Sequence, residues 1–285
     1  MSNPISDPLV RDVISEDVAA APVTLAVTPE GIATVTLRRP ERRNAFDGPM
    51  VAALTEIFET LRADEQVRLV LLRGEGGVFC AGGDLDWMRA AADWSEDDNR
   101  DDALAMGHML KALFDLPALT VALVEGAALG GGAGLAAACD LALATADARL
   151  GFPEVRVGLI PAVISPYVVR AIGPRAAGAL FALGQPVDAS RALALGLVSE
   201  VVADAAGLEA AAAALSKDIL ACAPGAVGEA KRVAHDVAGH ALDQGLIHDT
   251  AKRLAAARVS DEGREGLAAF LDKRPPAWAV KGETA

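Results

Sequence analysis

Cysteine, histidine and tyrosine are scarce in this sequence of 285 residues, which contains three, four and one of them respectively. Cys80, Cys139 and Cys222 lack the paired spacing of a zinc site, and an odd count argues against a disulfide framework. We expect all three to be small buried hydrophobes in a reducing compartment. The histidines show neither triad nor ligand spacing, so no metal site is predicted.

Positive charge is also in short supply, with 26 Lys and Arg against 39 Asp and Glu and a net charge of −13. Such a surface repels phosphate backbones and anionic lipids, which argues against binding to nucleic acid or to a membrane. No apolar run free of charges and glycines is long enough to span a bilayer. Residues 1–22 lack the features of a signal peptide, so a flexible N-terminal arm and a cytoplasmic location are predicted.

What the sequence does contain is 52% hydrophobic residues, arranged in alternating strand and helix patterns. The first half predicts an antiparallel hairpin followed by right-handed crossover units, which is typical of an α/β protein. Beyond Pro161 the pattern is helical. We therefore predict a core domain over residues 23–210 and a helical region over 211–285. The predicted strands are 24–28, 32–37, 67–72, 120–124 and 141–145, and the predicted helices are 51–61, 103–116, 163–172, 175–183, 189–195, 208–223, 241–258 and 262–273.

Two glycine-rich turns follow predicted strands and lead into predicted helices. They cover residues 74–85 and 126–134. Neither has the spacing of a dinucleotide fingerprint or a P-loop. Glycines at such a turn let a ligand approach the main chain, and unpaired N–H groups at a helix start stabilise negative charge. The two turns could each donate one N–H to the same carbonyl oxygen, which is the usual construction of an oxyanion hole.

The motifs Phe79-Cys-Ala-Gly-Gly-Asp-Leu85, Gly130-Gly-Gly132, Cys139-Asp140 and Pro153-Glu154, in this order, resemble those of the crotonase family, also called the enoyl-CoA hydratase/isomerase family. The resemblance runs from about residue 24 to 274. It implies a crotonase-like spiral of repeated β-β-α units with a C-terminal helical trimerisation region. It also implies a homo-oligomer, either a trimer or a hexamer made of two trimers.

By this resemblance, the N–H groups of Ala81 and Gly131 would hold the thioester oxygen of an acyl-CoA. Glu154 would transfer the proton at the carbon beside the thioester. Typical two-glutamate hydratases of the family carry a second glutamate where this chain has Gly134. A single glutamate is enough for a double-bond isomerase, which only moves a proton.

Further residues are predicted to bind substrate because of their place in the family's motifs. Arg38, Arg39, Arg42 and Arg43 form the densest basic cluster, where the family places the adenine and phosphates of CoA. The CoA ester is the substrate, and no separate cofactor is implied. The predicted substrate-binding residues are Arg43, Ala45, Ala81, Gly82, Gly83, Asp84, Leu85, Trp87, Met88, Gly131, Phe270 and Lys273.

The segment that contains Trp87 and the one around Gly158 resemble a subgroup of bacterial methylglutaconyl-CoA and isohexenylglutaconyl-CoA hydratases of leucine and terpene breakdown. Their substrates carry an extra carboxylate, which Arg156 or Arg170 could bind. Between Asp93 and Asp102, Ser95 with Asp98 predicts a helix cap, and the remainder predicts a solvated, mobile segment.

The first functional hypothesis is therefore an enoyl-CoA hydratase of fatty acid or leucine metabolism that adds water to a conjugated double bond. The alternatives are an enoyl-CoA isomerase that uses Glu154 alone and a non-catalytic acyl-CoA-binding protein.

Overall fold

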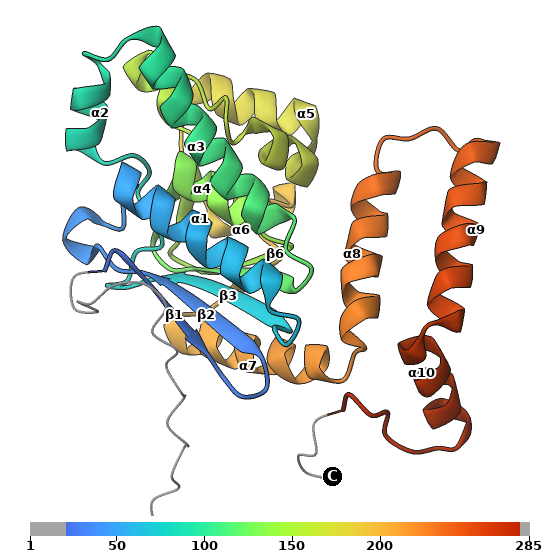
Figure 1. Ribbon diagram of the computed structural model, residues 1–285. Helices are drawn as coiled ribbons and strands as arrows, with labels where there is room; N and C mark the ends of the chain where they lie inside the picture. Colours follow the sequence, from blue (N-terminus) through green and yellow to red (C-terminus); the bar gives the residue numbers. More distant parts are fainter. Residues whose placement is uncertain (1–20, 280–285) are drawn as a thin grey trace, which may run out of the picture.

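The computed structural model describes residues 21–279, so nearly all of the predicted N-terminal arm lies outside the described residues. Its main sheet has six strands in the order β1-β2-β3-β4-β6-β9 (Figure 1). β1 and β2 form the predicted antiparallel hairpin, and the other neighbouring pairs are parallel. These strands are β1 (Val23–Val27), β2 (Ile32–Leu37), β3 (Leu69–Gly74), β4 (Leu119–Val124), β6 (Leu141–Thr145) and β9 (Glu200–Val202).

A second sheet, which the sequence patterns did not predict, has three short strands in the order β5-β7-β8. They are β5 (Ala127–Leu129), β7 (Arg149–Gly151) and β8 (Val187–Asp188). β5 follows β4 and leads into a helix, and β7 follows β6 in the same way. Main-sheet strand, short strand and helix therefore repeat as a unit, which confirms the predicted α/β spiral.

Helices surround both sheets, and most of them lie where the sequence predicts them (Figure 1). The α-helices are α1 (Gly48–Ala63), α2 (Leu85–Ala91), α3 (Glu96–Phe114), α4 (Gly131–Ala138), α5 (Ser165–Leu183), α6 (Ala189–Leu195), α7 (Ala205–Leu220), α8 (Pro224–Val237), α9 (Gln244–Val259) and α10 (Asp261–Leu271). Two 3-10 helices, η1 (Pro40–Arg42) and η2 (Glu154–Val157), lie in the connecting segments.

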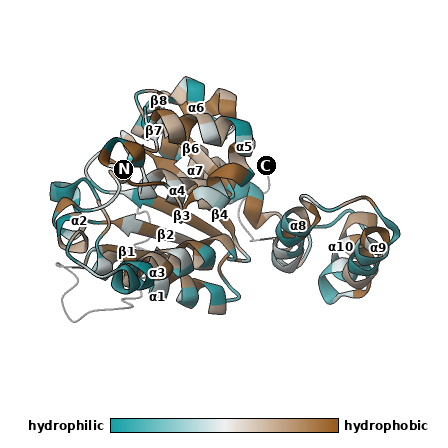
Figure 2. Ribbon diagram, turned by 90° about the horizontal axis from the view of Figure 1, so that it is seen from above, coloured by the Kyte–Doolittle hydropathy of each residue, from teal (hydrophilic) through white to brown (hydrophobic). Residues whose placement is uncertain are grey.

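Both faces of the main sheet are buried, because successive side chains of a strand point to opposite sides. In β3, Val70 and Leu72 join the core that α1, α3 and α4 cover, whereas Leu69 and Leu71 join the core that α7 covers. The strands are accordingly coloured as hydrophobic in Figure 2, while the outer sides of α1, α2 and α3 are largely hydrophilic. The predicted domain boundary at residue 210 falls inside α7, and this helix packs on the sheet with the core.

Helix α3 begins earlier than predicted. Ser95 accepts a hydrogen bond from the N–H of Asp98 at 3.1 Å, which confirms the predicted cap. The acidic residues that follow it form the first turns of α3, so this segment is helical, and it is exposed to solvent as predicted. Carboxylates are favourable at this end because the exposed N–H groups of a helix start carry partial positive charge.

The helical tail after α7 is joined by polar contacts within itself. Sequence reasoning did not predict α8 as a separate helix. Glu262, in the first turn of α10, accepts hydrogen bonds from the N–H groups of Gly225 at 2.9 Å and Ala226 at 3.0 Å, and so caps α8. Trp278 donates to the carbonyl of Ala221 at 3.2 Å. The tail is thus an ordered unit, and α9 and α10 stand away from the sheets in both views (Figures 1 and 2).

A membrane-spanning helix is not found among the described residues, since no single helix there is both long and apolar enough. Only α7 and α8 taken together meet the length and composition requirement, and these two helices are bent by 107°.

Candidate active site

The two glycine-rich turns lie side by side because Cys80 and Ala128 form a parallel bridge between them. Cys80 donates its N–H to the carbonyl of Ala127, and Leu129 donates to the carbonyl of Cys80, both at 3.0 Å. Gly82 has a φ of +101°, and a β-carbon added there would lie 3.0 Å from the Leu129 oxygen. Only glycine fits this combination of backbone conformation and close approach without strain.

Unpaired backbone N–H groups lie where these turns meet, among them those of Gly83 and Gly131. Gly131 is the first residue of α4, so its N–H has no acceptor within the helix. The N–H of Gly83 likewise has no hydrogen-bond acceptor among the described residues. A β-carbon added at Gly130 would lie 4.0 Å from Gly82 Cα, so the two unpaired donors belong to adjoining segments. Such a pair can bind one oxygen that carries negative charge.

The prediction that Ala81 is one of the donors was wrong. Its N–H donates to the carbonyl of Arg43 at 3.0 Å and is not available to a ligand. Arg43 and Asn44 have left-handed backbone conformations, with φ of 53° and 55°, and these carry the chain across the turn. Gly83, two residues further on, is left as a candidate donor of this turn, and the N–H of Gly131 is unpaired as expected.

Glu154 lies at the start of η2, against the second glycine turn. Its position follows from β7, because Gly151 at the end of that strand accepts the N–H of Gly130 at 2.8 Å. A β-carbon added at Gly130 would lie 3.1 Å from the Oε1 atom of Glu154. The carboxylate therefore contacts the segment that presents the Gly131 N–H.

Glu154 is half-buried, and its Oε2 atom is fully buried without a hydrogen-bond partner. Burial raises the pKa of this carboxyl above its ordinary value, and its own backbone N–H only partly offsets the effect. A buried polar oxygen is nearly always hydrogen-bonded, so an unpaired one requires a functional or structural reason. A carboxyl with a raised pKa beside two unpaired N–H donors is suited to proton transfer next to a developing negative charge.

The space beside Gly134 is filled by a hydrocarbon side chain. A β-carbon added at Gly134 would lie 2.1 Å from Cγ2 and 2.5 Å from Cβ of Ile164, which is 3% exposed. Gly134 therefore does not leave an empty space for water. At the position where two-glutamate hydratases carry their second carboxylate, this chain is apolar.

Sequence reasoning missed two side chains that contact Gly131. A β-carbon added at Gly131 would lie 2.6 Å from Cε of Met106 and 3.1 Å from the ring of Phe46. Met106 is on α3, where the sequence shows it only as one apolar position in a helical pattern. On the other turn, a β-carbon added at Gly83 would lie 3.3 Å from Sδ of Met88. A methionine thus lies against each unpaired donor.

The remaining predicted binding residues on α2 are placed differently from one another. Trp87 is half-buried, whereas the side chain of Leu85 is 72% exposed. Asp84 is 4% exposed and accepts hydrogen bonds from the N–H groups of Asp86 and Trp87, so its side chain is not free to bind a ligand. This carboxylate caps α2.

The predicted basic cluster is divided by the structure. The Arg39 guanidinium is bound to two carboxylates, so it is not free for the phosphates of CoA. It also donates to the carbonyl of Ala45, which is 6% exposed. Arg42 pairs with the exposed Asp86 at 3.1 Å, and Arg43 is exposed. Arg42 and Arg43 therefore stay the candidates for CoA.

Phe270 and Lys273 do not approach the glycine turns within the same chain. Phe270 is on α10, with 79% of its surface exposed, and Lys273 follows that helix. Figure 1 shows α10 on the far side of α8 from the sheets. Contact between these residues and a CoA bound at the glycine turns would need the tail of another subunit.

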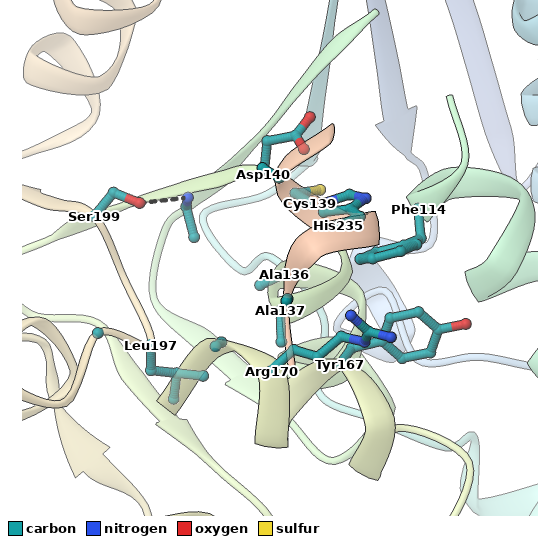
Figure 3. A pocket seen from close by; sticks show the side chains of 15 residues that line it. Phe114, Ala136, Ala137, Cys139, Asp140, Tyr167, Arg170, Leu197, Ser199 and His235 are labelled. Carbon is teal, nitrogen blue, oxygen red and sulfur yellow. Dashed lines mark hydrogen bonds between the residues drawn. The ribbon is translucent and has the colours of Figure 1, made fainter. Parts of the chain in front are cut away.

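A separate cavity of about 460 Å³ lies at the opposite end of α4, between the core and α8 (Figure 3). Arg170 lines it, with its guanidinium 5.7 Å from the centroid of the Phe114 ring. His235 stacks on the same ring at 4.2 Å. The predicted role of Arg170 as a partner for a substrate carboxylate was therefore wrong. Arg156 donates to the carbonyl of Gly184 at 2.7 Å and is held at the end of α5.

Within residues 21–279, no three His, Cys, Asp or Glu side chains converge in a way that could hold a metal ion.

Comparisons with known proteins find relatives over most of the chain. A family model described as enoyl-CoA hydratase/isomerase matches residues 27–281. The human protein named enoyl-CoA hydratase domain-containing protein 2, mitochondrial, is 36% identical over 269 residues, which are 90% of this chain and 88% of that protein. Human mitochondrial methylglutaconyl-CoA hydratase is 32% identical over 265 residues, covering 89% and 74%. A crystal structure of an enoyl-CoA hydratase from Shewanella pealeana matches with a TM-score of 0.87 at 36% identity, covering 90% of this chain and 96% of that one.

Proposed function

The chain belongs to the enoyl-CoA hydratase/isomerase family, and we propose that it adds water to the conjugated double bond of an enoyl-CoA thioester. The observation that carries the proposal is the buried, unpaired Oε2 atom of Glu154 near the glycine turns that present the unpaired N–H groups of Gly83 and Gly131. One acid–base group and two donors are the minimum that this reaction needs.

In the proposed reaction, the thioester oxygen accepts hydrogen bonds from both N–H groups. Water adds to the β-carbon, and its attack places negative charge on this oxygen. Each preorganised donor lowers the barrier by about 3 kcal/mol. The Glu154 carboxylate takes a proton from the attacking water and returns a proton to the α-carbon, so the carboxyl is unchanged after each cycle. No separate cofactor takes part, because CoA is part of the substrate.

Double-bond isomerisation is the second candidate, and one observation favours it. Ile164 fills the space beside Gly134, so a second carboxylate that could hold water is missing. An isomerase needs one carboxyl to remove a proton from one carbon and to deliver it to another. The raised pKa of Glu154 serves this reaction as well as hydration.

The proposed substrate is a branched, methylglutaconyl-type enoyl-CoA of leucine degradation. The similarity to human methylglutaconyl-CoA hydratase supports this choice. The two methionines beside the glycine turns, Met88 and Met106, also support it, since flexible thioethers adapt to a branched chain. The exposed Arg42 and Arg43 would attract the CoA phosphates.

The three free cysteines fit a reducing compartment such as the cytoplasm. The proposed assembly is a trimer or a dimer of trimers.

Mass-resolved turnover tests the proposal. The wild type and Glu154→Gln are each given crotonyl-CoA, 3-methylglutaconyl-CoA and a non-conjugated enoyl-CoA. We expect a gain of one water with a conjugated substrate, and loss of this product in the variant. A shifted double bond at unchanged mass would favour the isomerase. Binding of all three esters without turnover would leave only a non-catalytic role.

A further inference from the structure

The guanidinium of Arg39 binds three acceptors from two separate parts of the chain. Its Nη1 atom lies 2.7 Å from the carbonyl oxygen of Ala45 and 2.9 Å from Oδ2 of Asp47. Its Nη2 atom lies 2.9 Å from Oδ2 of Asp84. The side chain of Arg39 is 17% exposed, so these bonds are only weakly screened by solvent. Arg39 therefore connects the segment around Ala45 to the turn that contains Gly83.

Asp84 directly follows Gly83 and is held from several directions. Burial alone would raise the pKa of its carboxyl, but the N–H groups of Asp86 and Trp87 and the Arg39 guanidinium together lower this pKa below its usual value. The carboxylate is thus charged at neutral pH and fixed in place. Because its other oxygen caps α2, Asp84 also fixes the start of that helix relative to the turn.

The backbone on both sides of Gly83 is bound to a single residue of the other segment. Phe46 donates its N–H to the carbonyl of Gly82, and its own carbonyl accepts the N–H of Asp84, both at 2.7 Å. Gly83 lies between these two bonds, and its N–H is the donor that stays unpaired. The direction of that N–H therefore depends on how firmly the two segments are held together.

We infer that Arg39 is a positioning residue, which holds the segment around Ala45 against Asp84 and so aims the Gly83 N–H at the thioester oxygen. The inference rests on the proposed function, because it assigns a role to that same oxygen. Arginine suits the task, since its rigid planar guanidinium offers five donors in a fixed arrangement, whereas a lysine ammonium cannot span three acceptors in this way.

The two carboxylates that bind Arg39 provide a matched pair of variants. Asp84→Asn removes the charge on the turn, and Asp47→Asn removes the charge on the other side. Both side chains are helix N-caps, Asp84 for α2 and Asp47 for α1, and asparagine caps a helix about as well as aspartate. Each variant thus weakens one ion pair of Arg39 and keeps the cap, but only one of them touches the turn with Gly83.

Two readouts separate positioning from general loss of structure. The first is the split between kcat and KM with the enoyl-CoA that the wild type hydrates or isomerises. The second is the absorption of bound dimethylaminocinnamoyl-CoA, which moves to longer wavelength when its thioester carbonyl is polarised. We expect Asp84→Asn to lower kcat by about 10- to 100-fold with little change in KM, because a small misplacement of a catalytic group has effects of this size. The absorption shift should shrink with it.

Asp47→Asn should lower the kcat and the absorption shift much less than Asp84→Asn, even where both variants melt at the same temperature, because the Ala45 carbonyl at 2.7 Å still ties Arg39 to that segment. Equal effects of the two variants on kcat and on the shift would overturn the inference and leave the proposed function standing. A wild type with neither turnover nor shift would overturn the proposed function and the inference together. Arg39→Lys should behave like Asp84→Asn; a wild-type kcat in this variant would also contradict the inference.

Discussion

The burial of Glu154 that suits it to proton transfer also makes its charged form costly in the folded protein. Because the folded pKa is raised, the protonated carboxyl favours the folded state below the unfolded pKa of about 4.5, and this contribution is lost as pH rises through the folded pKa. We therefore predict that Glu154→Gln, which is neutral at every pH, melts at a higher temperature than the wild type at pH 7. The difference should disappear below pH 4.

The control for this prediction is Glu56→Gln, which neutralises an exposed carboxylate on α1. It should change the melting temperature much less, because a solvated charge costs little. Melting curves of the three proteins between pH 4 and 8 provide the measurement. A wild type that is more stable than Glu154→Gln at pH 7 would show that the carboxylate has a stabilising partner in solution.

Gly134 and Ile164 form a steric pair that can be tested separately from activity. We predict that Gly134→Ala lowers the free energy of unfolding by about 1–3 kcal/mol, since overpacking a core costs this much. Ile164→Ala removes the Cγ2 atom at 2.1 Å but leaves Cβ at 2.5 Å from the new methyl group. The double variant should therefore recover only part of the loss, measured against Ile164→Ala alone by urea unfolding.

Gly107→Ala is the matched control, because its β-carbon would make an ordinary contact with Val163 at 3.8 Å. This substitution on α3 should be neutral or stabilising. Equal costs at Gly107 and Gly134 would contradict the steric explanation.

For single residues, the sequence predicted that Glu154 and the unpaired N–H of Gly131 come together, but not that Gly83 in place of Ala81 has the unpaired N–H. The motif places Ala81 and Gly83 in the same turn, and either could present a free N–H. The choice depends on a hydrogen bond to Arg43, whose carbonyl reaches the turn only because of a left-handed backbone. Such a long-range bond leaves no periodic or compositional signal. The apolar filling beside Gly134 could not be predicted for the same reason.

At the scale of single elements, α5 contains two glycines that differ only in backbone conformation. Gly173 breaks the helix with φ 74° and ψ 159°, whereas Gly178 lies within the helix, and a β-carbon at either would meet no atom within 4 Å. We predict that Gly173→Ala destabilises the protein by about 1–3 kcal/mol, because this region of φ and ψ is nearly exclusive to glycine. Gly178→Ala should stabilise it by about 0.4–1 kcal/mol.

Denaturant unfolding of the two variants measures the contrast directly. If both substitutions lowered the free energy of unfolding by a similar amount, contacts and not backbone strain would determine the effect at both sites. A break at Gly173 was predictable from the sequence, since Gly173-Pro174 interrupts an otherwise continuous helical pattern.

Most elements with a clear periodic pattern were predicted, with α8 as the exception, and the shortest strands were not. The hairpin, α1 and α6 lie where alternation or helical spacing predicts them. β5, β7 and β8 have two or three residues each, too few to show a period, yet β5 and β7 position both Gly130 and Glu154. The least predictable elements therefore lie next to the candidate site, because their pairing is decided by tertiary contacts.

For the molecule as a whole, the helical tail of α8, α9 and α10 is the part that buries very little of its surface within one chain. α9 buries none of its residues, and α8 and α10 bury one residue each. Helices in proteins derive most of their stability from packing of an apolar face. Apolar side chains are instead exposed along α9 and α10, including Leu254 at 54%, Leu267 at 56% and Phe270 at 79%. Exposed apolar side chains gathered on two neighbouring helices indicate an interaction site.

We predict that these helices are covered by another copy of the chain, and that Leu254→Glu and Leu267→Glu weaken this association. A buried charge without a partner opposes assembly, so light scattering after size exclusion should show the wild type as an oligomer and the double variant as smaller species. Lys252→Glu, on the exposed surface of the same helix, is the control and should leave the mass unchanged.

If Phe270 or Lys273 of one subunit reaches the CoA of another, disassembly must raise KM for the CoA ester although Glu154 and both glycine turns are intact. A wild type that elutes as a single chain with full activity would contradict both the assembly and that use of the tail.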